Sequence, residues 1–305
     1  MKRIVDGIYP TMMVAYNSDG DIDYGAMKAL IQWYLENGVH GIFALCHSTE
    51  SHWLTFSEKL KLAEFTVKTV DGKIPVVMSG VTGVNIDRQI YEAHAISAAG
   101  ADAIVFIRNR LGGDFRQFCE FLDRIIENVD DRIPLGLYEC PYPYNKHLTE
   151  AEFAYAVGTG RFAFLKDTSC SMDVMRSRLE IKESAAGSRF SLFNANSATL
   201  LESLRCGYNG FSGLMANIHP DLYVWLFEHQ NDERAKLVSA YLGMMSLIEM
   251  RCYPVCAKRY LDIYEGIHMT DICRSVADTT VPALTSELEA IHRLTVEARS
   301  IVNSR

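Results

Sequence analysis

Residues 100–138 read GADAIVFIRNRLGGDFRQFCEFLDRIIENVDDRIPLGLY and have the pattern of a strand, a helix and a second strand. Two short apolar runs, at 103–107 and 135–138, have the length and composition of buried parallel strands. Between them, residues 114–128 repeat apolar side chains with the spacing of an amphipathic helix. Gly100 precedes the first run and is a stop signal for an earlier helix. This stretch therefore predicts a βαβ unit.

The same alternation runs through the first two thirds of the chain. Apolar runs with strand character lie at residues 8–14, 39–45, 74–78, 103–107, 135–138, 161–166, 189–193 and 210–214. Helical patterns lie at residues 24–36, 57–70, 85–98, 114–128, 149–157, 172–185 and 197–205, with Ser57 as an N-cap. Eight such strands predict an α/β fold of the TIM (β/α)₈ barrel type. An open doubly wound sheet is the alternative, and it favours a glycine-rich turn where this chain has Pro10-Thr11-Met12-Met13.

The last third of the chain is helical in pattern. Candidate helices lie at residues 222–228, 233–249, 253–266 and 285–304. We expect residues 1–225 to form the barrel and residues 226–305 to form a C-terminal helical extension packed on it.

Composition narrows the function classes. The chain has 305 residues, 49% of them hydrophobic, and a net charge of −8. No run of like charges predicts a nucleic-acid surface, and no apolar stretch predicts a membrane span or a signal peptide. The eight cysteines form no CxxC pair, which favours reduced, mostly buried thiols and a cytoplasmic location. We expect a small-molecule ligand.

Lys166 ends the apolar run Phe162-Ala163-Phe164-Leu165, at the C-terminal end of the sixth predicted strand. Catalytic groups of (β/α)₈ barrels come from these strand ends. A lysine amine that is buried without a partner has a lowered pKa, and the neutral amine is the form that attacks a ketone. The alternative is an ion pair at the barrel rim with Asp167 or Glu139. The residues alone leave both interpretations open.

Tyr138 ends the fifth predicted strand. Because side chains alternate along a strand, Tyr138 shares a face with Gly136, and Lys166 shares a face with Phe164. If both faces point into the barrel, Tyr138 lies beside Lys166 and its phenol can move protons to and from a substrate. The alternative is a core tyrosine whose hydroxyl is satisfied within the protein.

His47, Ser48 and Thr49 follow the second predicted strand. Hydroxyls, an imidazole and loop N–H groups can together hold a carboxylate, so we expect these three residues to bind substrate. A plain turn is the alternative. A metal site formed by His47, Glu50 and His52 is a third possibility, and their irregular spacing argues against it.

Further candidates for substrate binding follow three more of the predicted strands. They are Arg108, Arg110, residues 142–146, Phe211 and Ser212.

Four stretches resemble the dihydrodipicolinate synthase/N-acetylneuraminate lyase superfamily, in order and in spacing. They are GIYPTMMVAY at 7–16, DGDIDYGAMKALIQWYLENGVHGIFALCHSTESHWLT at 19–55, LYECPYPY at 137–144 and FLKDTS at 164–169. The resemblance covers roughly residues 4–218. It implies a (β/α)₈ barrel with a C-terminal helical extension, usually in a homotetramer, and a lysine that forms a Schiff base with pyruvate or another 2-keto acid.

The matching motifs assign roles by resemblance. Lys166-Asp167-Thr168-Ser169 is similar to the family's K-E/D-A/T-S/T, and Tyr138-Glu139-Cys140-Pro141 to its Y-N-x-P, with Glu139 in place of Asn. Residues 46–50 resemble G-T/S-T-G-E, which holds the carboxylate of the keto acid. In that loop Ser48 keeps the second hydroxyl and His47 replaces the first.

Several positions depart from the family pattern. Pro143 stands where the synthases have an arginine, residues 109–111 (Asn-Arg-Leu) replace P-Y-Y, and Phe164 replaces a common glycine. We therefore do not expect the synthase reaction itself.

The resemblance implies a lyase of the class I aldolase type. Lys166 would form the imine, Tyr138 would move the proton of the C4 oxygen, and no cofactor or metal is expected. A 2-keto-3-deoxy sugar acid dehydratase would use the same imine. Two rival interpretations are a non-catalytic keto-acid-binding protein and an unrelated barrel with a structural Lys166. We expect a homo-oligomer, either a tetramer or a dimer.

Overall fold

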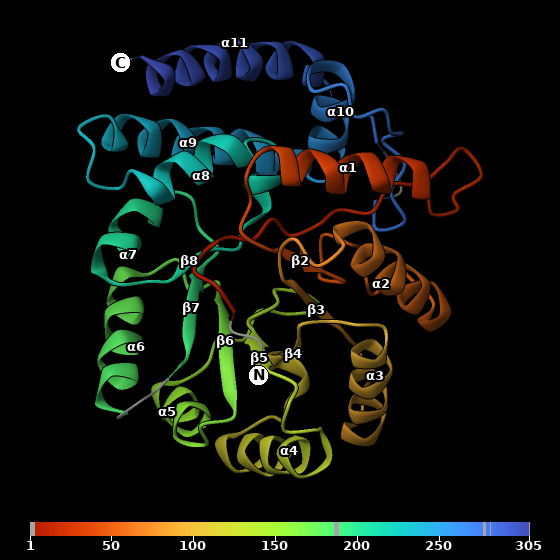
Figure 1. Cartoon of the computed structure of the whole chain (residues 1–305), viewed down its shortest axis with the longest axis vertical. Helices are drawn as coiled ribbons and strands as arrows, with labels where there is room; N and C mark the ends of the chain where they lie inside the picture. Colours follow the sequence, from red (N-terminus) through yellow and green to blue (C-terminus); the bar gives the residue numbers. More distant parts are fainter. Residues whose placement is uncertain (1–3, 186–188, 277–278, 281, 305) are drawn as a thin grey trace.

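The computed structural model describes residues 4–185, 189–276, 279–280 and 282–304. Its strands form one sheet in the order β1-β8-β7-β6-β5-β4-β3-β2, and every neighbouring pair is parallel. A parallel bridge between Thr11 and Phe43 joins the two ends of the sheet. In Figure 1 the strands lie at the centre and helices surround them. The predicted (β/α)₈ barrel is confirmed.

The elements alternate as the sequence predicts. The strands are β1 (Gly7–Ile8), β2 (Ile42–Ala44), β3 (Val76–Val81), β4 (Ala103–Ile107), β5 (Leu135–Tyr138), β6 (Phe162–Asp167), β7 (Ser191–Asn194) and β8 (Gly210–Phe211). The α-helices are α1 (Tyr24–Glu36), α2 (Phe56–Val70), α3 (Ile86–Ala98), α4 (Phe115–Asn128), α5 (Glu150–Gly158), α6 (Met172–Ser184), α7 (Leu200–Cys206), α8 (Pro220–Glu228), α9 (Ala235–Glu249), α10 (Val255–Tyr264) and α11 (Leu284–Asn303). Short 3₁₀ helices are η1 (Arg108–Arg110), η2 (Leu214–Asn217) and η3 (Met250–Cys252).

Several predicted boundaries are wrong: the second strand is Ile42–Ala44 rather than residues 39–45, for example, and the third is Val76–Val81 rather than 74–78. The first strand is much shorter than residues 8–14, because Pro10 has no N–H to donate to the ladder. The eighth ends at Phe211, and η2 begins at Leu214. The N-cap of α2 is Thr55 rather than Ser57, since Thr55 and Glu58 form a reciprocal capping box.

Two hydrophobic layers lie on the two sides of the barrel wall. The inner layer includes Tyr9, Phe43, Tyr138, Phe164 and Phe193. The larger outer layer lies between the strands and the surrounding helices. Side chains of the inner layer fill the barrel below its C-terminal mouth, so polar groups at the strand ends sit above an apolar floor.

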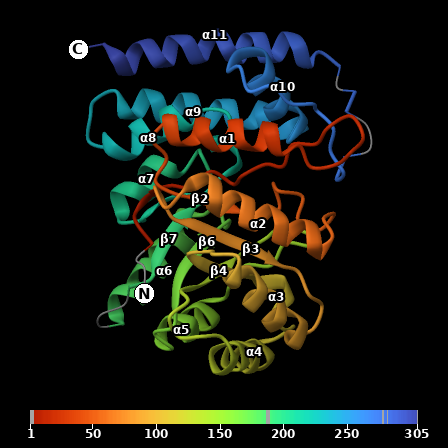
Figure 2. The same cartoon turned by 45° about the vertical axis from the view of Figure 1, so that its right-hand side comes forward.

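The C-terminal helices stack on one side of the barrel. Figures 1 and 2 show α9, α10 and α11 beyond α1 and α8, with α11 farthest from the strands. The segment between α10 and α11 returns toward the barrel mouth. Its Thr270 hydroxyl donates to the Tyr16 carbonyl at 2.6 Å, and the Ser275 N–H donates to Glu50 Oε2 at 2.6 Å. No helix in the described part of the chain is long and apolar enough to cross a membrane.

Candidate active site

Lys166 lies near the C-terminal end of β6 and is only 3% exposed. The sheet register places it opposite Tyr138 on β5 and Phe193 on β7. Its Nζ lies 4.6 Å from the centre of the Tyr138 ring and 5.2 Å from that of Phe43. Burial lowers the pKa of the amine from 10.5 to about 8, although the nearby Cys46 and Cys140 act in the opposite direction.

The rim ion pair that the sequence left open for Lys166 does not form. Within the described residues, Lys166 forms no ion pair, and both Glu139 and Asp167 pair with Arg178 of α6 instead. Arg178 Nη1 lies 2.5 Å from Asp167 Oδ2 and 3.3 Å from Glu139 Oε2. Among the described residues, the close neighbours of the buried Lys166 amine are therefore aromatic rings and thiols.

The Glu139–Arg178–Asp167 cluster is fully satisfied. Glu139 also accepts from the N–H groups of Leu148 and Thr168, at 2.8 and 3.0 Å. Burial raises the pKa of Glu139 despite Arg178. For Asp167, burial is outweighed by Arg178 and by hydrogen bonds, so its pKa is lowered. These contacts hold the ends of β5 and β6 together beside Lys166.

Tyr138 points into the barrel, as strand alternation predicts. Its ring makes an edge contact with Phe43 at 5.5 Å, within the inner layer. Burial raises the pKa of its phenol well above 10, and the thiol of Cys140 is its hydrogen-bonding neighbour. The phenol is therefore neutral at physiological pH, so it acts by donating its proton or by relaying one, and not as a phenolate base.

The loop after β2 turns sharply at the barrel mouth. Leu45 and Glu50 bound it with left-handed φ angles of 50° and 54°. The Thr49 hydroxyl is used within the loop, since it donates to the Met12 carbonyl at 2.6 Å and accepts from the Cys46 N–H at 3.2 Å. A direct substrate bond from this hydroxyl is thus not favoured.

Three backbone N–H donors of this loop are free. The backbone N–H groups of His47, Ser48 and Thr49 donate to no described residue. The Ser48 hydroxyl donates to the Thr11 hydroxyl at 3.0 Å. Consecutive free N–H groups form the kind of concavity that binds a carboxylate.

The loop does not assemble a metal site from His47, Glu50 and His52. Glu50 turns toward the C-terminal extension, where its Oε1 lies 3.6 Å from the buried Lys258 Nζ. In the described chain, no group of three or more His, Cys, Asp or Glu side chains has a metal-binding arrangement.

His47 stands at the mouth in an aromatic cluster. Its ring stacks on Tyr142 with centres 5.4 Å apart and planes 16° apart, and Trp53 and His52 lie at 5.9 and 6.1 Å. Burial, and next the charge of Lys166, lower the pKa of His47 below 6.5. The imidazole is therefore mostly neutral at physiological pH.

Phe211 and Ser212 face opposite sides of the barrel wall. The Phe211 ring stacks on Tyr223 of α8, with centres 4.5 Å apart, so it belongs to the outer layer and does not reach Lys166. The Ser212 hydroxyl is buried and has no partner within the described residues. Because side chains alternate along the strand, Ser212 rather than Phe211 remains a candidate for substrate binding.

Of the three cationic candidates after β4 and β5, two are used for structure. Arg108 is fully buried, donates from Nε to Glu152 Oε2 at 3.0 Å and lies over the Phe118 ring. Lys146 donates to two carbonyls of the loop after η1. Arg110 keeps a buried Nε without a partner in the described chain.

The comparisons with known proteins agree with this geometry. The model of the dihydrodipicolinate synthetase family matches residues 4–291. The chain belongs to this family. Its members are Schiff-base-forming lyases and synthases that act on small 2-keto acids, and this chain is an enzyme of that type.

Individual relatives are distant. The chain is 29% identical to the probable 2-dehydro-3-deoxy-D-pentonate aldolase YjhH of Escherichia coli, over 74% of each chain. It is 25% identical to a 4-hydroxy-tetrahydrodipicolinate synthase of Polynucleobacter asymbioticus, over 72% of this chain and 71% of that one. Among solved structures, YagE of E. coli, a prophage protein in complex with pyruvate, superposes with a TM-score of 0.84 at 22% identity, over 95% and 98% of the chains.

At two positions that depart from the family pattern, neighbouring residues accommodate the change. Phe164 occupies space that Gly136 leaves open on the neighbouring strand, where a Cβ would lie 3.0 Å from the Phe164 Cβ. Asn109 replaces the first residue of P-Y-Y and anchors the loop after β5 through the carbonyls of Cys140, Tyr142 and Tyr144, at 2.7–3.0 Å. This family member thus holds the Tyr142 loop by its own hydrogen bonds.

Sequence reasoning missed some residues of the site. Arg178 lies on the buried face of α6 with Met175 and Leu179, and a charged residue in that apolar stripe was an available signal. Tyr253, from the extension, accepts from Asn217 Nδ2 at 3.1 Å, and its hydroxyl is a hydrogen-bonding neighbour of Ser48 in the carboxylate loop. No local pattern marked Tyr253, since 36 residues separate it from Asn217.

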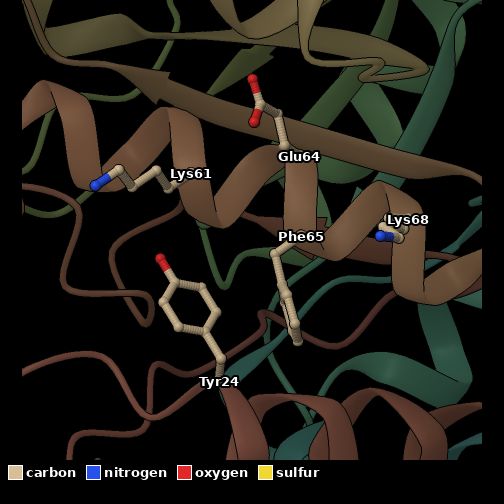
Figure 3. Close-up of a pocket in the computed structure, with 5 residues that line it drawn as sticks. All are labelled: Tyr24, Lys61, Glu64, Phe65 and Lys68. Carbon is tan, nitrogen blue, oxygen red and sulfur yellow. The ribbon is translucent and has the colours of Figure 1, made fainter.

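A surface pocket lies away from this site. It has a volume of about 380 Å³ and is lined by Tyr24, Lys61, Glu64, Phe65 and Lys68. Figure 3 shows four of these side chains on α2 and Tyr24 at the start of α1. The pocket lies on the helical shell and does not include any strand-end residue.

Proposed function

We propose that the enzyme is a class I aldolase in which Lys166 forms a Schiff base with pyruvate or a close 2-keto acid. The observation that carries this proposal is the buried Lys166 amine, which has no ion pair within the described chain and a pKa of about 8. Near pH 7.5 about a quarter of such amines are neutral, against about one in a thousand at a pKa of 10.5. The names of YjhH and of the YagE–pyruvate complex support the substrate class.

The mechanism follows from this geometry. The neutral Nζ attacks C2 of the keto acid, and loss of water gives an iminium. In cleavage, the C4 hydroxyl loses its proton to the Tyr138 hydroxyl, which passes its own proton to solvent. The C3–C4 bond breaks, its electrons neutralise the iminium as an enamine, and an aldehyde leaves. Protonation at C3 and hydrolysis then release the shorter keto acid. The free N–H groups of residues 47–49 and the hydroxyl of Ser212 bind polar groups of the substrate.

Borohydride reduction in the presence of pyruvate tests this proposal. Borohydride reduces an imine to a stable amine, so we expect one pyruvate-derived adduct per chain, located on Lys166 by peptide mass mapping. If neither pyruvate nor a panel of 2-keto acids leaves an adduct on Lys166, the proposal is wrong.

Replacing Tyr138 with Phe tests the proton donor at the C4 oxygen. We expect Tyr138→Phe to form the trapped adduct normally but to slow aldol turnover roughly 10²-fold or more, as loss of an acid–base group does. Aldehyde release measured at saturating substrate checks this. Unchanged turnover would remove Tyr138 from the mechanism.

We also propose that the enzyme is a homo-oligomer, a tetramer or a dimer. Support comes from a row of exposed apolar side chains on α9 and η3. They are Leu237, Met244, Leu247, Ile248 and Met250, which are 38–61% exposed. Burial of such a patch against a second copy would remove it from water.

A charge placed in this row tests the assembly. We expect Leu247→Glu to lower the sedimentation mass of the protein, because a carboxylate would be buried without a partner. Lys28→Glu is the control, because the Lys28 side chain is exposed on α1. This variant should not change the sedimentation mass. A wild-type monomer would refute the proposed oligomer.

The proposal also covers the cellular location and the domain division of the enzyme. We propose a cytoplasmic location, which the eight free cysteines support. Only three of them, Cys46, Cys140 and Cys256, are buried, so the expectation of mostly buried thiols is wrong. We keep residues 1–225 as the barrel and 226–305 as the extension, a division supported by the contacts that tie the extension to the barrel mouth.

A further inference from the structure

The two ring nitrogens of His47 have different surroundings. Nδ1 is buried and has no hydrogen-bond partner within the described chain. Nε2 also bonds to no described residue, but it is not among the buried atoms, and His47 as a whole is partly exposed. One nitrogen therefore lies inside the protein and the other opens toward solvent.

The ring is held in one orientation. Tyr142 stacks on it, and Trp53 and His52 contact it from other directions. Tyr142 is itself fixed, because its carbonyl accepts from Asn109 Nδ2 at 3.0 Å. A buried nitrogen without a hydrogen bond is rare in a side chain that only packs. A fixed ring with such a nitrogen is typical of a positioned acid–base group.

The Schiff base needs a base that its other neighbours do not supply. Burial raises the pKa of both Tyr138 and Cys140, so both stay protonated at physiological pH. The pKa of His47 is lowered, first by burial and then by the charge of Lys166. Of these groups, His47 is the one that can accept a proton near neutrality.

We propose that His47 is the acid–base residue at C3 of the keto-acid imine. This inference rests on the proposed Schiff base. The imidazole takes a C3 proton from the iminium: the C3–H bond breaks, an N–H bond forms, and the C–H electrons neutralise the iminium as an enamine. The reverse step protonates C3 after aldol cleavage. The imidazolium then releases a proton to solvent, while Tyr138 relays the proton of the C4 oxygen.

The charges around His47 keep it neutral in the free enzyme and in the complex. The titratable groups around His47 come from three strands and the loops that follow them. They are Lys166 from β6, Tyr138, Cys140 and Tyr142 from β5 and its loop, and Cys46 and His52 from the β2 loop. Arg110 and Lys59 act on His52. None of these groups is a carboxylate. Because the iminium keeps the positive charge of Lys166, imine formation does not raise the pKa of His47.

Hydrogen–deuterium exchange of the pyruvate methyl group tests the role without knowledge of the aldehyde. Exchange at saturating pyruvate is followed by proton NMR in D₂O from pH 5 to 8, and borohydride trapping measures the imine at each pH. We expect wild-type exchange to fall at low pH with one protonation below about 6.5. His47→Gln should still trap pyruvate with borohydride, but exchange about 10²-fold more slowly and without this low-pH decrease.

Two further variants separate chemistry from packing. His52 lies in the same aromatic cluster, so His52→Gln disturbs the packing without removing the proposed base. This variant should keep the decrease of the exchange rate at low pH. His47→Thr restores a hydroxyl at this position and should exchange as slowly as His47→Gln, since a neutral hydroxyl is not a base near neutral pH.

The outcomes distinguish this inference from the proposed function. Failure of the wild type to trap pyruvate or any other 2-keto acid refutes the Schiff base. Trapping without exchange, a wild-type exchange rate that is flat with pH, or wild-type exchange in His47→Gln refutes the role of His47. If both His47 variants fail to fold, the wild-type profile still decides: exchange that falls at low pH while trapping does not supports the role, and exchange that only follows trapping refutes it.

Discussion

Lys166→Met gives no borohydride-dependent adduct with pyruvate and loses aldol turnover by on the order of 10⁴-fold or more. The covalent path depends on the one amine that lies at the end of β6, and methionine offers no nucleophile there. Intact-mass spectrometry after borohydride treatment and a pyruvate-release assay check the two effects. An adduct that persists in Lys166→Met would show that another lysine is the nucleophile.

The same variant should gain stability while it loses activity. Folding lowers the Lys166 pKa from 10.5 to about 8, so the folded state binds this proton more weakly than the unfolded state. The shift costs about 3 kcal/mol at pH 7, and the cost disappears as the pH rises from about 8 to 10.5. Methionine removes the cost and still fills the space between Phe43 and Tyr138. Denaturant unfolding should therefore show a more stable Lys166→Met protein at pH 7, with a smaller difference at pH 10.

Lys59 provides a matched control. It is also buried, and burial lowers its pKa to about 8, but its Nζ donates to the Thr82 hydroxyl at 2.5 Å and to the Gly80 carbonyl at 3.4 Å. Lys59→Met should trap pyruvate on Lys166 as the wild type does, and it should not gain stability, because two hydrogen bonds are lost. Stabilisation by both variants would mean that burial alone, rather than the missing partner, sets the effect at Lys166.

The fold could be predicted because its signals are local. Apolar runs and helical periodicity gave β4, β5 and α1 with the bounds that the structure has. The errors fall where one residue changes the hydrogen-bond pattern, as at Pro10 in the first strand and at the capping box of Thr55 and Glu58. Such effects depend on single donors, which a periodicity of apolar residues does not detect.

The site was predictable only where strand alternation applies. Alternation and parallel pairing correctly placed Tyr138 beside Lys166. Phe211 could not be assigned in this way, because the end of its strand was predicted too late and a shift of one residue reverses the direction of a side chain. Arg108 lies beyond β4, in η1, where strand alternation does not apply. The partner of Glu139 could not be found at all, since Arg178 lies 39 residues away on a helix.

Arg178→Met should destabilise the fold more than either Lys59→Met or Tyr138→Phe. It would leave Glu139 and Asp167, both with 0% exposed side chains, without the cation that pairs with them. Removing one partner of a buried charge network costs about 3–5 kcal/mol. Denaturant unfolding at pH 8 measures this loss, and borohydride trapping should weaken in parallel, because the cluster joins the ends of the strands that carry Tyr138 and Lys166.

The pH dependence of Arg178→Met separates charge from packing. Without the guanidinium, one of the two carboxylates must take up a proton, and this is Glu139, because burial already raises its pKa above 4.5 and loss of Arg178 raises it further. A raised carboxyl pKa contributes stability at low pH that is lost as the pH rises through the folded pKa, so this variant should be more stable near pH 5 than near pH 8. Adding Glu139→Gln removes one of the two like charges and should restore part of the stability at pH 8. A double variant as unstable as Arg178→Met at every pH would show that the arginine acts through its packing against Phe153, whose ring centre lies 5.9 Å from the guanidinium, rather than through its charge.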